Sequence, residues 1–223
     1  MSHAPDIDEV EGLPKGLWER LLAQPERAPE LIAMAAADRF GPRAAEWVEV
    51  AGVGVAPHEL AETAFKKHVL LSRVEGAALG LGGVFTAAPD LVALLWIQSR
   101  MVFYIGAAHG YDPRHPMRPA ELLALQGVYP SAAEARAALD GMGKPLARAM
   151  VEKALQSGST QGLHVRLMKF LAKRLAKRYA ARLIPLLGAP LGAIQNGGAT
   201  KALGRAALAY YGGSAATGAQ ARP

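Results

Sequence analysis

The chain has 223 residues, a formal net charge of +6 and 51% hydrophobic residues, enough to bury the core of one domain. It has no cysteine, which excludes disulfides, thiol catalysis and cysteine-ligated zinc and favours the reducing cytoplasm. The first twelve residues are acidic and do not resemble a signal peptide. No uninterrupted apolar run reaches the ~18 residues that a membrane-spanning helix needs.

The predicted elements are helices throughout, and no strand pattern of useful length appears. Prolines, glycines and capping residues mark the ends of the helices. Ser131 and Glu134 have the spacing of a capping box. We expect eight to ten helices. Their predicted ranges are 16–23, 30–40 (ending at Gly41–Pro42), 43–52, 58–83 (following Pro57 and ending in glycines), 89–110, 119–128, 131–141, 144–155, 160–184 and, beginning at Thr200, 200–211.

The predicted helix over residues 89–110 is apolar on nearly all sides, so we expect it to be buried at the centre of an all-α bundle. Asp90 suits its positive N-terminal end. One domain is predicted over residues 13–212, with a disordered segment at 1–12 and a flexible tail at 213–223.

Charge is divided unevenly along the chain. All 19 acidic residues lie between Met1 and Glu152, whereas the segment from Lys153 onward has 11 Lys or Arg residues and no acid. Such a segment favours a polyanionic partner, either a membrane surface or nucleic acid. The alternative is that the acidic front of the chain packs on the basic back within one domain.

Two stretches carry a family resemblance. VEGAALGLGGVFTAAPDLVALLWIQSRMVFYIGAAHGYDP resembles the centre of the EcsC family, with a Gly-rich turn, a Pro-Asp helix start, a Gln in the helix and an end similar to YGxDP. KRYAARLIPLLGAPLGAIQNGGATKALGRAALAYY is similar to the family's C-terminal pattern of a basic helix, a Pro/Gly-rich apolar segment and a final helix ending in aromatics. The resemblance covers residues 55 to 211. It implies an all-helical, membrane-associated bacterial protein, whose founding relative is encoded beside an ABC transporter, and it implies no established reaction.

The predicted helix over residues 160–184 is amphipathic, with an apolar stripe opposite a wide cationic face. Such a helix can lie on an anionic membrane, pack inside a protein or bind nucleic acid. Nucleic acid is disfavoured because only Phe170 and Tyr179 lie among the basic residues and no nucleic-acid-binding motif is visible. We therefore predict a membrane-binding face formed by Arg166, Lys169, Lys173, Arg174, Lys177, Arg178 and Arg182.

Four polar residues of the apolar helix or its end remain as candidates for a site: Asp90, Gln98, Arg100 and His109. One interpretation is structural, with Asp90 as a cap and the others paired internally. The other is a polar spot in an apolar cleft that binds a lipid head group or a small amphiphile. A lipid-acting hydrolase with Asp90 or His109 in its site is the enzymatic alternative.

The remaining motifs predict no cofactor or metal. His109, Asp112 and His115 match no metal-binding spacing, so His109 is interpreted as a helix-end cap. His68 lies among basic residues and is predicted to be on a solvated face. GLGG at 80–83 follows no strand and is interpreted as a tight turn. The sequence thus favours a non-enzymatic peripheral protein at the inner face of the cell membrane, with a lipid ligand and a membrane transporter as candidate partners.

Overall fold

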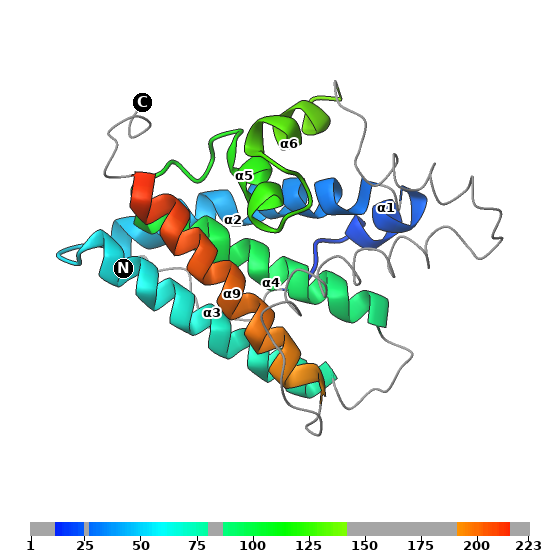
Figure 1. Ribbon diagram of the computed structural model, residues 1–223, viewed down its shortest axis with the longest axis horizontal. Helices are drawn as coiled ribbons and strands as arrows, with labels where there is room; N and C mark the ends of the chain where they lie inside the picture. Colours follow the sequence, from blue (N-terminus) through cyan, green and yellow to red (C-terminus); the bar gives the residue numbers. More distant parts are fainter. Residues whose placement is uncertain (1–11, 25–26, 80–86, 142–190, 215–223) are drawn as a thin grey trace.

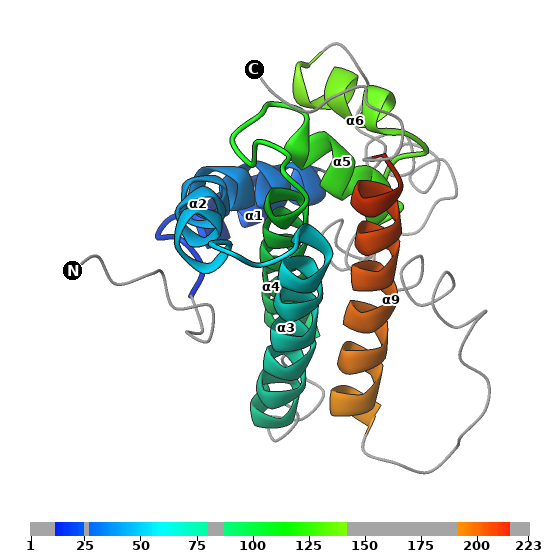
Figure 2. The ribbon, with the colours of Figure 1, turned by 90° about the vertical axis from the view of Figure 1, so that its left-hand side faces the viewer.

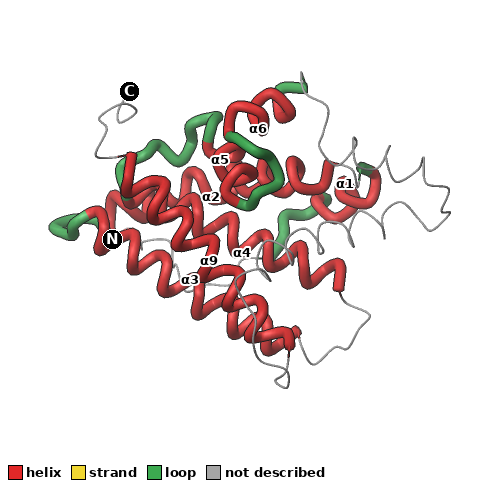
Figure 3. Tube along the Cα trace, viewed as in Figure 1, coloured by secondary structure: helices red, strands yellow, loops and turns green. Residues whose placement is uncertain are grey.

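The computed structural model describes residues 12–24, 27–79, 87–141 and 191–214, and in these ranges the chain consists of helices joined by turns and loops, with no strand (Figures 1 and 3). The predicted all-α class is therefore confirmed for them. The predicted helices over 144–155 and 160–184 and the predicted mobile ends at 1–11 and 215–223 lie outside the described residues, so the total of eight to ten helices stays a prediction. The described helices are α1 (Leu17–Ala23), α2 (Ala28–Ala51), α3 (Pro57–Leu79), α4 (Ala87–Ala108), α5 (Arg118–Leu125), α6 (Ala132–Leu139) and α9 (Leu191–Ser214).

Helix α4 contacts α2, α3, α5 and α9. Figure 2 shows α3, α4 and α9 running side by side, with α2 crossing near one end. Every residue from Leu95 to Ala108 is buried, as expected for a helix that is apolar on nearly all sides. Even so, none of the described helices, α4 included, has the length and hydropathy needed to cross a bilayer.

The predicted break at Gly41–Pro42 is wrong, because α2 continues through both residues as one helix. Pro42 cannot donate a helical hydrogen bond, but it lies on the exposed side, where water can satisfy the carbonyl it leaves unpaired. Gly41 faces inward, and a Cβ at this position would lie 3.0 Å from the carbonyl oxygen of Pro113. The two residues thus accommodate a close contact between α2 and the α4–α5 loop, while the apolar face of α2 keeps the helix continuous.

Two predicted helix starts also differ from the structure. Helix α9 begins at Leu191 instead of Thr200, and α4 begins at Ala87, two residues before the predicted Pro89. Thr200 is fully buried in mid-helix, where its hydroxyl accepts a hydrogen bond from Gln98 on α4. A residue type that suits a helix start is here used for a contact between helices.

The predicted cap of α6 is confirmed. Ser131 has an extended backbone, and its Oγ accepts the Glu134 backbone N–H at 3.2 Å. The Ser131 hydroxyl also donates to the Glu134 carboxylate at 3.3 Å. Just before this cap, the Tyr129 hydroxyl donates to buried Glu30, which ties the α5–α6 connection to α2.

Helix α9 approaches its neighbours most closely at Gly204. A Cβ there would lie 2.4 Å from a ring carbon of Phe65 on α3 and 3.0 Å from the sulfur of Met101 on α4. Because Phe65 is buried and Met101 fully so, neither side chain has free space to move into. The absence of a side chain at Gly204 therefore sets the distance between α9 and the α3–α4 pair.

We expect Gly204→Ala to lower the free energy of unfolding by about 1–2 kcal/mol, because overpacking of about 1–3 kcal/mol exceeds the gain in helix propensity. Gly213→Ala is the matched control, since no atom lies within 4 Å of a Cβ at that α9 position. Urea denaturation of both variants measures the difference. Equal stability of the two variants would contradict the close packing inferred at Gly204.

Candidate functional site

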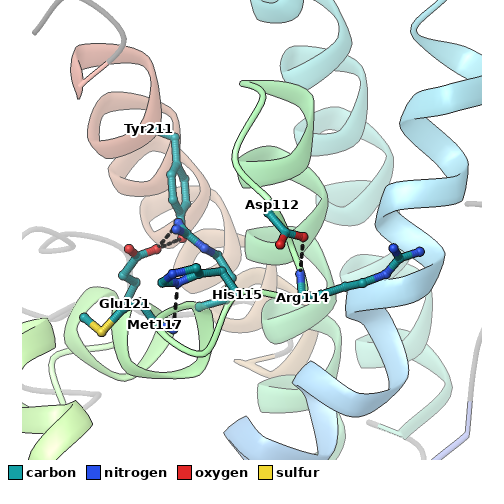
Figure 4. A network of polar contacts seen from close by, with 7 residues as sticks. Asp112, Arg114, His115, Met117, Glu121 and Tyr211 are labelled. Atoms are coloured by element: carbon teal, nitrogen blue, oxygen red, sulfur yellow. Dashed lines mark hydrogen bonds and ion pairs between the residues drawn. The ribbon is translucent and has the colours of Figure 1, made fainter. Parts of the chain in front are cut away.

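The loop between α4 and α5 is ordered by its own side chains (Figure 4). Gly110 has φ 84°, a left-handed conformation that lets the chain turn after α4. Asp112 Oδ1 accepts the backbone N–H of Arg114 at 2.9 Å, and His115 Nδ1 accepts that of Met117 at 3.2 Å. These turns fix the conformation of the chain up to the first residue of α5.

A buried ion pair follows at once. The Arg118 guanidinium donates to Glu121 Oε2 at 2.5 Å, and both side chains are almost completely removed from solvent. The hydroxyl of Tyr211 on α9 donates to the same oxygen at 2.8 Å, as Figure 4 shows. One carboxylate therefore joins α5 to α9 through a residue that lies 90 positions further along the chain.

Aromatic rings enclose the guanidinium of Arg118. It lies 5.1 Å from the ring centroid of Tyr111 and 5.9 Å from that of Tyr211. The two rings meet edge to face at 5.1 Å, and the Tyr211 ring packs against Gly106 of α4. Cation–π attraction and the ion pair thus hold the same cation, a combination that favours burial of its charge.

Burial sets the protonation of this network. It raises the pKa of Glu121, against the opposing effects of Arg118 and the Tyr211 hydroxyl. It also raises the pKa of Tyr211 well above 10, and the nearby Glu121 carboxylate adds to that increase, so Tyr211 keeps its proton and remains a donor. A carboxyl with a raised pKa can serve acid–base chemistry, but Glu121 is only 3% exposed and both donors to its Oε2 come from the protein. The geometry therefore describes a structural tie between helices.

Gln98 and Arg100 are both buried on α4 but contact different helices. The Gln98 Nε2 donates to Thr200 Oγ1 on α9 at 3.3 Å. The Arg100 guanidinium lies 6.0 Å from the ring centroid of Phe40 on α2 and 5.4 Å from that of Tyr104. The structure does not bring these two predicted site residues onto one surface, and their role toward a ligand stays a prediction.

His109 directly follows α4, where its backbone N–H donates to the Ile105 carbonyl at 3.2 Å. Its side chain packs beside Gly212 of α9, and Nε2 is buried without a hydrogen-bond partner. Burial, followed by the proximity of His58, lowers the pKa of His109 below 6.5. The imidazole is therefore neutral at pH 7 and stays close to the interior at the end of α4.

The predicted solvated position of His68 is wrong, because this side chain is fully buried. Its Nδ1 donates to the Ala64 carbonyl one turn earlier at 2.7 Å, and its ring meets Tyr104 edge to face at 5.4 Å. The neighbouring Lys66 is exposed on another side of α3. Basic neighbours in sequence therefore did not indicate the orientation of this histidine, since adjacent helical residues face different directions.

Several candidates lie outside the part of the chain whose side chains the structure describes: Asp90, Arg166, Lys169, Lys173, Arg174, Lys177, Arg178 and Arg182. Among the described side chains, no three His, Asp or Glu residues are grouped so as to hold a metal ion. Sequence reasoning missed the network of Arg118, Glu121 and Tyr211. The pair of Arg118 and Glu121 could have been found from the sequence, because opposite charges three residues apart in a predicted helix often interact. Nothing in the sequence near this pair indicates Tyr211.

Most of the chain is similar to one known protein family. The sequence profile described as "EcsC protein family" matches residues 56–212, from the start of α3 to nearly the end of α9. The chain belongs to the EcsC family. The predicted resemblance is thus confirmed, and the matched region contains the whole Arg118–Glu121–Tyr211 network and excludes α1 and α2.

One relative is an uncharacterized protein, YdbA, of Bacillus subtilis strain 168. The two proteins are 41% identical over 56 residues, which are 25% of this chain and 21% of YdbA. The match therefore covers only about a fifth of that protein. No solved structure matches this chain significantly.

We expect Tyr211→Phe to lower the free energy of unfolding at neutral pH by about 1.5–3 kcal/mol, because it removes a hydrogen bond to a buried carboxylate. The difference should shrink above about pH 10. In this pH range Tyr211 loses its proton in the unfolded wild type but keeps it in the folded state, so the folded wild type becomes less stable relative to the unfolded one. The variant has no such hydroxyl and does not lose stability through this group.

Urea denaturation at about pH 7 and about pH 11 measures both effects. Tyr111→Phe is the control, since it keeps the Tyr211 hydroxyl and a ring against Arg118. If the difference in free energy of unfolding between wild type and Tyr211→Phe stayed constant across this pH range, a raised pKa of Tyr211 would not contribute to stability.

Proposed function

We propose that the protein is a peripheral, non-enzymatic membrane protein of the EcsC family that binds anionic lipid head groups. The observation that carries the proposal is the acid-free segment from Lys153 onward, which has 11 Lys or Arg residues among its 71 positions. Near an anionic surface, each such cation contributes on the order of 1 kcal/mol of attraction. The proposed site of action is the inner face of the cell membrane.

The described part of this segment, α9, supports the proposal. Its inward side carries Leu203, Ala207 and Tyr211, all of which are buried. Lys201 and Arg205 lie one turn apart on the exposed side. The alternative, in which the basic part of the chain neutralises the acidic part internally, requires covered cations, and these two are not covered.

An exposed aromatic residue lies further along the same helix. Tyr210 lies on α9 near its C-terminal end and is 42% exposed. Tyrosine suits the boundary between water and lipid, because its ring is apolar and its hydroxyl is polar. The helical period places Tyr210 on a different side of the exposed face of α9 from Lys201 and Arg205, and both kinds of side chain suit an anionic head-group layer. An accessory role beside a membrane transporter is the extension of this proposal that the family resemblance suggests.

Vesicle flotation tests the proposal. The wild-type protein should float with anionic vesicles and stay behind with neutral ones, and binding should weaken between about 0.1 M and 1 M salt, as the Debye length falls from ~10 Å to ~3 Å. Two variants should lose binding: Lys169→Glu/Lys173→Glu/Lys177→Glu and Lys201→Glu/Arg205→Glu. Lys15→Glu/Arg20→Glu/Arg114→Glu is the matched control, since it gives the same charge as the triple variant through exposed cations elsewhere.

The alternatives give different results. Internal packing of the basic segment predicts no flotation at any salt concentration and loss of the folded state in the first triple variant, measured by circular dichroism. A nucleic-acid function predicts that duplex DNA displaces the protein from vesicles at equal charge. A lipid-acting hydrolase predicts lipid turnover in the floated fraction, measured by mass spectrometry.

A further inference from the structure

The connection between α2 and α3 is an exposed apolar turn. From Val50 to Pro57 no side chain is charged or polar. Three valines of this segment project from it, and we call them the valine tip: Val50, Val53 and Val55, exposed by 46%, 79% and 39%. Connecting turns are normally rich in polar residues, and a cluster of exposed apolar residues at such a place indicates a binding function.

The turn holds these valines away from the helical body. The Gly52 N–H donates to the Val48 carbonyl at 2.9 Å and closes α2, and the Val55 N–H donates to the Gly52 carbonyl at 3.1 Å. Gly54 has φ 73°, a conformation that favours glycine. Because backbone hydrogen bonds define the turn, the valines are exposed by its geometry.

The size of the valine tip argues against a protein partner. Three partly exposed valines offer at most a few hundred Å² of surface, whereas a stable protein–protein interface buries about 800 Å² on each partner. A bilayer sets no such minimum, because shallow insertion of a few apolar side chains adds to the attraction from a separate basic surface. The small apolar tip therefore matches a lipid surface better than a second protein.

We propose that the valine tip inserts into the boundary between the head groups and the acyl chains of the bilayer. This inference rests on the proposed function and adds the part of the protein that enters the lipid. Glu49 and His58 flank the uncharged segment and are exposed, so they limit its depth to the head-group level. Since the tip itself carries no charge, its contribution should not depend on salt.

The arrangement of the helices allows the valine tip and the C-terminal end of α9 to meet the same membrane. The turn between α2 and α3 and the C-terminal end of α9 lie at the same end of the helical body in Figure 1. One contact supports this placement, since His109 at the end of α4 packs beside Gly212 of α9, and His109 also lies near His58 at the start of α3. A membrane facing this end would meet the valine tip together with Tyr210.

A single fluorescent label tests the insertion. The chain has no cysteine, so Val53→Cys provides one thiol for a polarity-sensitive dye. With vesicles of three parts phosphatidylcholine and one part phosphatidylglycerol, its emission should shift to the blue. The same dye at Ala133→Cys, an exposed position on α6, should not shift.

Substitution tests the contribution to affinity. Val53→Ser/Val55→Ser should weaken vesicle binding at least about tenfold, because apolar surface no longer leaves water, and by a similar factor at low and at intermediate salt. Leu22→Ser/Leu70→Ser is the matched control, since these leucines are 59% and 61% exposed outside the tip. It should bind like the wild type.

Each outcome decides between the proposals. The insertion is overturned if the wild type floats but the dye at Val53→Cys shows no blue shift, or if the serine variant binds with unchanged affinity. Either outcome leaves the proposed function intact. Absence of flotation overturns both. A wild type that sediments as a dimer, with a monomeric Val53→Ser/Val55→Ser variant, would assign the tip to a contact between copies of the chain and overturn the insertion.

Discussion

The buried ion pair of Arg118 with Glu121 is the constraint on which the contact between α5 and α9 depends, because a guanidinium is costly to bury without groups that stabilise its charge. Glu121 supplies the charge within a single turn of α5, and Tyr211 of α9 completes the network. Breaking a buried pair by removing one partner typically costs about 3–5 kcal/mol, a large fraction of the stability of a domain. The packing of Tyr211 against Gly106 of α4 lies beside this pair, whereas the rest of α9 packs mainly on α3.

Other buried polar side chains of the helical body are also paired between helices. Gln98 with Thr200 connects α4 to α9, and Tyr129 with Glu30 connects the α5–α6 segment to α2. Each contact satisfies polar groups that would otherwise be costly to bury, and each fixes one relative position of two helices. Apolar packing supplies most of the stability, whereas these contacts select one arrangement among several that would bury similar area.

Local signals in the sequence predicted the features that depend on neighbouring residues. The helical class, a helix start next to Pro57 and the cap at Ser131 follow from residue pattern and capping chemistry. The break predicted at Gly41–Pro42 and the helix start predicted at Thr200 are wrong because contacts with distant segments outweighed local preference. The same limit applies to the site: the polar residues of α4 were visible in the sequence, but their partners lie on helices far along the chain.

The attachment of α9 has a consequence for the newly made protein. Helix α9 packs mainly on α3, and α3 ends at Leu79, 135 residues before α9 ends at Ser214. At a synthesis rate of about 5–20 residues per second, the surface of α3 around Phe65 waits roughly 7–27 s for its partner helix. During that interval an apolar surface remains open on the ribosome-bound chain. A chain that stops before α9 keeps it open, which makes such fragments natural clients for chaperones and proteases.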